Sequence, residues 1–178
     1  MLSELSNCVK PVGLEINFEK TVYMGNREYA TVRPLKCETH EVKSVKSFKF
    51  LGARISLPMD FKITVKQRIS VAQSVFNSLK IIFCRPRYPM TMKRHLFISK
   101  ILPSLTYGCE TWTQSAEEMD LISKAVRKIE RQLLGISLLE HIQNDTIRMR
   151  TRFRDVQRIV AVKKWNWLGE LLKWTTQD

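Results

Sequence analysis

The acidic residues of this chain limit the reactions that it can catalyse by itself. Two-metal-ion chemistry on nucleic acids needs carboxylates close enough to share Mg²⁺, commonly two adjacent acids on a turn and a third on a neighbouring strand. No aspartate stands next to another here: they are Asp60, Asp120, Asp145, Asp155 and Asp178. The adjacent pair Glu117-Glu118 follows Ser115 in a capping-box pattern, so helix capping explains it. The sequence therefore predicts no complete catalytic metal site in the chain and no cofactor bound by the chain alone.

The cysteines and histidines do not form a recognisable ligand set either. Cys8, Cys37, Cys84 and Cys109 are widely spaced without a CxxC motif, and only Cys37 and His40 lie close together. One such pair supports neither a zinc signature nor a disulfide framework. Glycine-rich phosphate loops and the G-x-S-x-G and H-E-x-x-H motifs are absent from the sequence. We expect a reduced intracellular protein, nuclear or cytoplasmic.

The net charge points to a polyanionic partner. The chain has 30 Lys and Arg against 17 Asp and Glu, a formal net charge of +13. Such an excess raises the affinity for any polyanion, with RNA or DNA first and an anionic membrane second, although it can also serve only solubility. No apolar run approaches the about 18 residues of a membrane span, and no export signal opens the chain. We therefore expect a soluble nucleic-acid-binding protein without a membrane partner.

Helical spacing would gather many of the basic side chains on common faces. Residues at i, i+3, i+4 and i+7 share one face of a helix. The candidate phosphate-binding residues that fit such faces are Lys62, Lys66, Lys124, Arg127, Lys128 and Arg131. A face of this kind either contacts phosphate or is simply solvated, and the sequence leaves both interpretations open.

The last part of the chain adds arginines and tryptophans. Four arginines, Arg148, Arg150, Arg152 and Arg154, stand at every second position, which a helix would splay around its axis and an extended segment would align. Arg148 and Arg150 are included among the candidate nucleic-acid-binding residues. Three indoles, Trp165, Trp167 and Trp174, follow with several leucines. We expect them in the core rather than stacked on bases.

The elements that must position these residues change type near Pro58. Short alternating segments at Leu14–Phe18, Thr21–Met24 and Ser47–Ile55 predict a small antiparallel sheet. Apolar residues at steps of four and three then predict an amphipathic helix from Asp60 to about Phe83. Further helices are predicted behind Ser115, around Asp145–Arg150 and over Asp155–Trp174. The fold class expected is α+β, mostly α, with divisions 1–58, 59–142 and 143–178.

Six motifs in order resemble one family of proteins. They are Gly13–Thr21, Phe50–Gly52, Leu102–Trp112, Arg131–Ser137, Asn144–Thr151 and Lys164–Gly169. In this order and at this spacing they resemble the C-terminal part of the endonuclease and reverse-transcriptase polyproteins of non-LTR (LINE-like, RTE-type) retrotransposons. Each motif is weak alone, but together they cover nearly the whole chain.

The resemblance implies a role for each segment. Residues 1–58 would be the end of the palm, in which Lys20 lies near the incoming nucleotide and Phe50, Leu51 and Gly52 form a primer-grip hairpin. Residues 59–142 would be the thumb, and 143–178 a post-thumb extension. In the family the paired aspartates that bind Mg²⁺ precede the Gly13 motif, so this chain would lack them. It also departs from the family at Phe50, where Tyr is more usual, and at Glu170, where His is more usual.

The expected function is to grip template and primer as part of an RNA-directed DNA polymerase, without polymerising alone. Its partners would be an RNA or DNA template-primer and the missing N-terminal portion of the enzyme, if that portion is encoded. Two alternatives remain open. The first is a degenerate, non-catalytic fragment that binds nucleic acid. The second is a helical protein-interaction module, for which an exposed apolar patch between Trp165 and Trp174 would be the sign.

Overall fold

The computed structural model describes residues 2–25, 35–37, 40–57, 59–113 and 115–175. The chain forms two compact units, Met1–Asp60 and Phe61–Asp178. The predicted change of element type at Pro58 falls on a position outside the described residues. Short strands in the first unit and helices in the second confirm the α+β, mostly α fold class.

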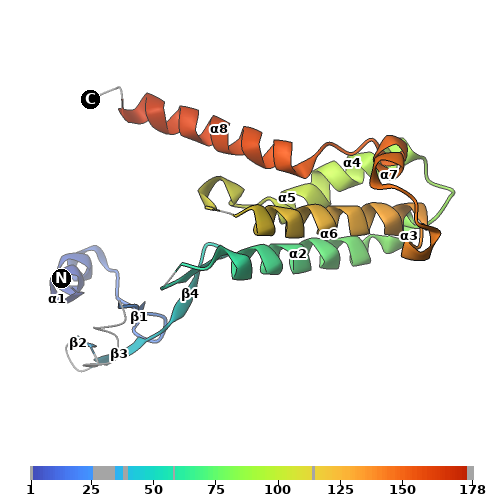
Figure 1. Cartoon of the computed structure of the whole chain (residues 1–178). Helices are drawn as coiled ribbons and strands as arrows, with labels where there is room; N and C mark the ends of the chain where they lie inside the picture. The colour runs from blue at the N-terminus through green and yellow to red at the C-terminus, as the bar shows by residue number, and fades with distance from the viewer. Residues whose placement is uncertain (1, 26–34, 38–39, 58, 114, 176–178) are drawn as a thin grey trace. The chain divides into compact units, whose positions relative to one another are not determined.

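The first unit combines a short helix with two small sheets (Figure 1). Its elements are α1 (Leu2–Val9), the 3-10 turn η1 (Lys10–Val12), β1 (Val22–Tyr23), β2 (Leu35–Cys37), β3 (His40–Ser44), β4 (Ser47–Phe50) and β5 (Ala53–Ser56). β3 is the central strand of a three-stranded sheet, antiparallel to β2 and parallel to β1. β4 and β5 form a separate antiparallel hairpin. The parallel pairing of β1 with β3 could not be foreseen, because alternation shows which face is buried and not the direction of the neighbour.

The predicted strand at Leu14–Phe18 is wrong. Leu14 to Asn17 have no regular structure, and Phe18 to Lys20 form a turn. The side-chain oxygen of Asn17 accepts a 3.1 Å hydrogen bond from the backbone N–H of Lys20. Asparagine side chains that bond to the backbone nearby favour turns over strands. This local bond replaces the sheet pairing that the apolar alternation suggested.

The second unit is a helical bundle. Its elements are α2 (Phe61–Ser78), α3 (Lys80–Phe83), α4 (Met90–Leu96), the π-helical segment η2 (Phe97–Ile101), α5 (Leu102–Leu105), η3 (Cys109–Thr111), α6 (Ala116–Leu134), η4 (Leu138–Glu140), α7 (Asn144–Thr151) and α8 (Val156–Thr175). The core is formed by the side chains that the helical periodicity selected, such as Val65 and Phe76 of α2 and Ile122 and Ile129 of α6. The predicted first helix is interrupted at Leu79, so α2 ends at Ser78 and α3 carries Phe83 into the same core.

Both ends of α6 are fixed by specific caps. The hydroxyl of Ser115 accepts a hydrogen bond from the N–H of Glu118, whose carboxylate accepts one from the N–H of Ser115. This confirms the capping box that the sequence predicted. At the other end Gly135 has φ +69°, a left-handed conformation that glycine adopts without a Cβ penalty. The two caps therefore fix where α6 begins and ends. α6 packs against α2, α7 and α8 and is the central helix of the bundle.

Candidate nucleic-acid interface

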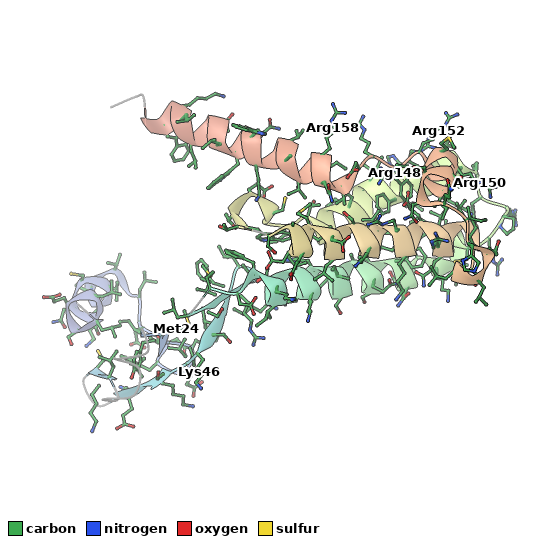
Figure 2. All side chains as sticks on the ribbon, in the orientation of Figure 1. Met24, Lys46, Arg148, Arg150, Arg152 and Arg158 are labelled. Atoms are coloured by element: carbon green, nitrogen blue, oxygen red, sulfur yellow. The ribbon has the colours of Figure 1, made fainter. Side chains whose placement is uncertain are left out.

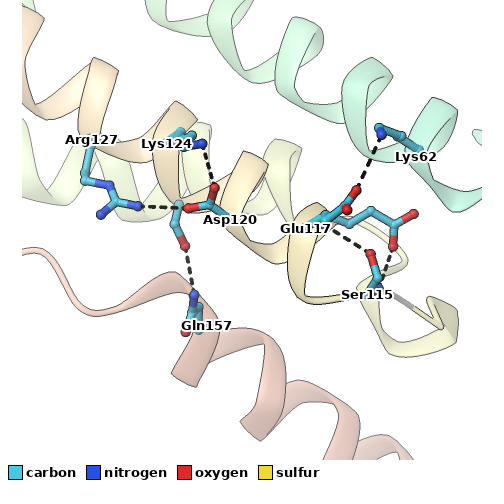
Figure 3. A network of polar contacts seen from close by, with 9 residues as sticks. Lys62, Ser115, Glu117, Asp120, Lys124, Arg127 and Gln157 are labelled. Carbon is cyan, nitrogen blue, oxygen red and sulfur yellow. Dashed lines mark hydrogen bonds and ion pairs between the residues drawn. The ribbon is translucent and has the colours of Figure 1, made fainter.

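The two predicted basic strips lie beside each other on the surface of the bundle. α2 and α6 pack side by side and run in the same direction (Figure 1). At the start of the pair Lys62 Nζ lies 3.6 Å from Glu117 Oε2 (Figure 3). Three to four turns later Gln73 Nε2 donates a 3.4 Å hydrogen bond to Gln132 Oε1. Because these contacts join the strips at both ends, their side chains form one continuous surface. We call Lys62, Lys66, Lys124 and Lys128 the α2–α6 basic surface.

Lys66 and Lys128 are the least restrained cations of the α2–α6 basic surface. Each follows Lys62 or Lys124 by one helical turn, and both side chains are exposed. Within the described ranges neither has an ion-pair partner. An ammonium group in this state is fully available for a phosphate.

Two other predicted phosphate ligands are partly neutralised by one aspartate. Lys124 Nζ lies 2.7 Å from Asp120 Oδ2, and Arg127 Nη2 lies 3.5 Å from Asp120 Oδ1 (Figure 3). Exposed ion pairs of this kind add little to stability, but the carboxylate lowers the local positive potential. The sequence could have indicated the pairing, since Asp120 precedes Lys124 by four residues on the same helix.

Arg131 has a structural role that the sequence did not reveal. Its Nη2 donates to the carbonyl of Ile142 at 2.8 Å and to Oδ1 of Asn144 at 3.1 Å. These bonds hold the segment after α6 against the helix. The Nη1 atom is buried and has no hydrogen-bond partner among the described residues. Arg131 therefore acts mainly as a structural brace that joins α6 to the segment after it. Helical periodicity placed Arg131 and Lys128 on one face, but it could not show that only Arg131 has this structural role.

A pocket of about 660 Å³ opens beside this brace. Its lining is mostly basic and polar: Asp120, Lys124, Arg127, Lys128, Arg131, Gln132, Ile136, Leu138 and Asn144. All four residues predicted on the basic face of α6 are among them. The face is thus hollowed on one side, where cations of α6 surround a space large enough for a small anionic group.

The arginines around α7 form a second basic region. Arg148, Arg150 and Arg152 belong to α7 or follow it directly, and Figure 2 shows them on the same side of the second unit as Arg158 of α8. Arg148 Nη1 lies 3.3 Å from Asp155 Oδ2, so it is partly neutralised, whereas Arg150 is exposed. Arg154, Arg158 and Lys163 line a further pocket of about 600 Å³.

Arg158 and Lys163 are candidates that the sequence analysis missed. The spacing of Arg154 and Arg158 by four residues could have indicated Arg158, whereas no comparable spacing marks Lys163. α7 ends just before Arg152, which has φ +52°, and irregular backbone over residues 152–155 leads the chain into α8.

In the first unit, the turn at Asn17 presents Lys20 to solvent. Besides the bond to Lys20, Asn17 accepts a 2.7 Å hydrogen bond at its carbonyl from the hydroxyl of Thr21. The asparagine and the threonine thus hold the turn, and Lys20 stays exposed. In this motif Asn17 and Thr21 fix the backbone, and Lys20 carries an accessible charge.

The hairpin β4–β5 carries an apolar tip. Leu51 and Gly52 form its two-residue loop and have φ +47° and φ +81°, and Phe50 pairs with Ala53 to close it. Positive φ at both loop positions is the geometry of a type I′ turn, which suits the twist of a hairpin. Leucine rarely adopts this conformation, so the turn is strained at Leu51. The side chains of Phe50 and Leu51 are both exposed.

The predicted burial of the tryptophans is wrong. Trp165 is 71% exposed and Trp174 76% exposed, and Trp167 is exposed as well. α8 buries Val156 and Val160 near its start. Its later part also carries large apolar side chains, but no other described element packs over them. Helical periodicity shows that a helix has an apolar face, but it does not show how far along the helix that face is covered.

The described residues hold no group of three or more His, Cys, Asp or Glu side chains that could bind a metal ion. Buried carboxylates are also few. Glu130 is 2% exposed, and its burial raises the pKa of the carboxyl above its ordinary range. A hydrogen bond from Thr151 lowers that pKa in part.

Among the described residues, no helix is both long and apolar enough to cross a bilayer.

Comparison with known proteins gives one informative similarity. The chain is 30% identical over 194 aligned residues to a transposon-derived protein of Caenorhabditis elegans, in an alignment covering 99% of this chain and 67% of the relative. No protein-family model matches the chain. No solved structure matches it either.

Proposed function

The chain belongs to the family of the transposon-derived protein of Caenorhabditis elegans, and from that premise we propose that it grips template and primer as part of a retrotransposon RNA-directed DNA polymerase. The family establishes transposon origin. The assignment to a reverse transcriptase, and to its thumb and primer grip, rests on the six motifs in order together with the arrangement of charge on the bundle.

The α2–α6 basic surface is the observation that carries this proposal. It unites lysines that are about 60 residues apart in the sequence along two parallel helices, and Lys66 and Lys128 are exposed there without an ion-pair partner among the described residues. A protein that follows a nucleic-acid backbone needs cations on helical faces and no base-specific contacts. Lys62, Lys66, Lys124 and Lys128 fit that requirement, with Arg127 at the edge.

Catalysis is not assigned to the chain itself. The intact enzyme of the family would use Mg²⁺ held by paired aspartates, and the described residues offer no carboxylate set for that ion. The described residues therefore do not fit a catalytic metal centre. Lys20, on its exposed turn, remains a candidate for a position near the incoming nucleotide once the rest of the enzyme is present.

The proposal is tested by measuring the affinity of the purified chain for an RNA–DNA duplex over a series of salt concentrations. Each phosphate contact contributes about 0.9 to the slope of log affinity against log salt on duplex DNA. We expect the double substitution Lys66→Glu with Lys128→Glu to weaken binding. It should also reduce the magnitude of that slope by about 1.8, the contribution of two phosphate contacts.

Lys100→Glu is the control for this measurement. Lys100 is also an exposed lysine, but it lies on η2 and belongs neither to the α2–α6 basic surface nor to α8. It should leave the slope nearly unchanged. Absence of salt-dependent binding in the wild-type chain, or equal losses in the control and the double variant, would refute the proposed grip.

A protein-interaction module is the second candidate, and one observation favours it. The apolar patch that this alternative required between Trp165 and Trp174 is exposed on α8. The two candidates are compatible, because the α2–α6 basic surface and this patch use different residues. A chain that fails to bind any nucleic acid but associates through α8 would leave only the second.

A further inference from the structure

The second half of α8 carries more exposed apolar surface than a solvated helix needs. Six large side chains there are at least 40% exposed: Trp165, Trp167, Leu168, Leu171, Leu172 and Trp174. The first half of the same helix is anchored, because Lys164 Nζ donates to the carbonyl of Trp112 at 2.5 Å and Lys163 Nζ lies 3.7 Å from Glu110 Oε1. In Figure 1 the C-terminal end of α8 extends beyond the other helices of the second unit. We call the six side chains the α8 apolar face.

The amount of exposed surface is that of a protein interface. An indole presents up to about 250 Å² and a leucine somewhat less, so the six exposed fractions amount to on the order of 700 Å². The largest apolar patch of a typical monomer is roughly 300 to 600 Å². A stable protein–protein interface buries about 800 Å² on each partner. The α8 apolar face therefore has the size that a specific partner would cover.

Charge indicates what kind of partner suits the face. From Trp165 to Trp174 the helix has one acidic and one basic residue, Glu170 and Lys173, and their side chains pair with each other at 2.8 Å. The face is thus locally neutral in a chain of net charge +13. Base-stacking sites of single-stranded nucleic acids combine aromatic rings with a groove of cations, and this face has three leucines among its rings instead. A neutral apolar surface is the better match.

The spacing of the six residues is symmetric along the helix. Three pairs are centred on the same point, between Gly169 and Glu170: Trp165 with Trp174, Trp167 with Leu172, and Leu168 with Leu171. A two-fold axis through that point places each of the six side chains level with another member of the set on an antiparallel helix. Two-fold dimers are the commonest oligomers and require such a self-complementary patch.

We propose that the α8 apolar face binds the same face of a second copy of this chain, with the two α8 helices antiparallel. The Glu170–Lys173 pair keeps the contact region neutral, so the charge of the two bundles opposes the dimer only over a distance at which salt screens it. This assembly does not depend on the nucleic-acid grip, since none of the six residues belongs to the α2–α6 basic surface.

Sedimentation velocity of the full chain over a wide range of concentrations tests the proposal. The wild-type chain should convert from monomer to dimer as its concentration rises. The double substitution Leu168→Glu with Leu171→Glu should raise the dimer dissociation constant by at least about a hundredfold, because each copy would bury two carboxylates. Circular dichroism of the variant checks that its helices remain.

The 3-10 helix η4, before α7, offers a control with the same change of residue types. Leu138 and Leu139 are 75% and 84% exposed, so Leu138→Glu with Leu139→Glu changes two exposed leucines outside the α8 apolar face. This control should dimerise as the wild type does. A second measurement needs no variant: hydrogen exchange of the wild-type chain should show amides 165–174 becoming more protected with concentration, while those in the middle of α6 stay unchanged.

Three results would overturn the dimer. They are a wild-type chain that stays monomeric at every concentration, a dimer that survives Leu168→Glu with Leu171→Glu, and a control that dissociates equally. If the chain stays monomeric and the α8 variant instead loses affinity for single-stranded RNA, the face belongs to base stacking and the dimer is refuted.

Discussion

The hydroxyl of Thr151, at the end of α7, donates a 2.7 Å hydrogen bond to Oε1 of Glu130, about one turn before the end of α6. Both residues are buried, and the carbonyl of Thr151 also accepts a 3.0 Å hydrogen bond from Nε of Arg94 in α4. Three helices therefore meet at one threonine. A buried carboxylate is costly unless it is hydrogen-bonded, so this contact is important for the stability of the bundle.

Replacing Thr151 by valine should destabilise the second unit. The change keeps the shape of the side chain but removes the donor, which leaves the Glu130 carboxylate buried without that bond, at a cost of about 1 to 3 kcal/mol. Urea unfolding followed by circular dichroism measures the free energy of unfolding. Thr151→Ser keeps the hydroxyl and should lose less. Equal losses for serine and valine would show that the methyl group, and not the hydrogen bond, matters.

The buried Glu130 should make stability depend on pH. Burial raises the pKa of its carboxyl above the ordinary value of 4.5, more than the hydrogen bond from Thr151 and the nearby Arg148 and Arg127 lower it. The folded state therefore holds this proton more tightly than the unfolded state does. The stability that protonated Glu130 contributes to the fold is fully present below about pH 4.5. It is lost as the pH rises through the pKa of Glu130 in the folded state.

Glu130→Gln isolates this contribution, because glutamine has nearly the same shape and does not ionise. The free energy of unfolding of the variant relative to the wild type should increase as the pH rises above 4.5 and then level off beyond the folded pKa. Urea unfolding at a series of pH values measures the difference. A difference that is independent of pH would mean that Glu130 keeps its ordinary pKa in the fold.

Lys128 and Arg131 should separate binding from stability. Lys128→Ala removes an exposed cation and should weaken duplex binding while leaving the free energy of unfolding within about 0.5 kcal/mol of the wild type. Arg131→Ala removes the bonds to Ile142 and Asn144 and should destabilise the chain by about 1 to 3 kcal/mol. Duplex titration and urea unfolding of both variants are the measurements. A marked loss of stability in Lys128→Ala would contradict its placement on the surface.

Two glycines should respond oppositely to alanine. Gly135 has φ +69°, and alanine in that conformation costs about 1 kcal/mol. Gly169 lies inside α8, where an added Cβ would meet no atom of the described residues within 4 Å apart from the neighbouring backbone of its own helix, so Gly169→Ala should stabilise the helix by up to about 1 kcal/mol. Urea unfolding reports Gly135→Ala, and hydrogen exchange along α8 reports Gly169→Ala. If both substitutions stabilised the chain, or both destabilised it, the backbone conformation of one of the two glycines would differ from the one described.

The thiols should react at two distinct rates. Cys8 and Cys84 are exposed, whereas Cys37 and Cys109 are buried. Burial raises the pKa of Cys109 to about 11, with a further rise from Glu110, so its thiolate is scarce at neutral pH. Titration of the native chain with a thiol reagent should show two fast groups and two slow ones, and all four should react in denaturant. Rapid reaction of Cys109 in the native state would show that the core around η3 opens.

Much of the fold could be predicted because its signals are local. The apolar stripe of α2, the capping box and terminal glycine of α6, and the spans of α7 and α8 are set by residues within a few turns of one another. The hairpin at Phe50–Gly52 is likewise a local structure. The missed elements depend on competition between local bonds and pairing at a distance, as at Asn17, or on the direction of a neighbour, as for β1 and β3.

The sequence by itself determined that the chain is basic, mostly helical and without paired aspartates, and which lysines and arginines share a helical face. Only the tertiary structure decided which of these cations are available. It joined Lys66 and Lys128 on one surface, paired Lys124 and Arg148 with aspartates, and used Arg131 as a brace. It also left Trp165 and Trp174 uncovered. The physical reason is that charge and periodicity are properties of one helix, whereas neutralisation and burial depend on what other segments bring within a few ångströms.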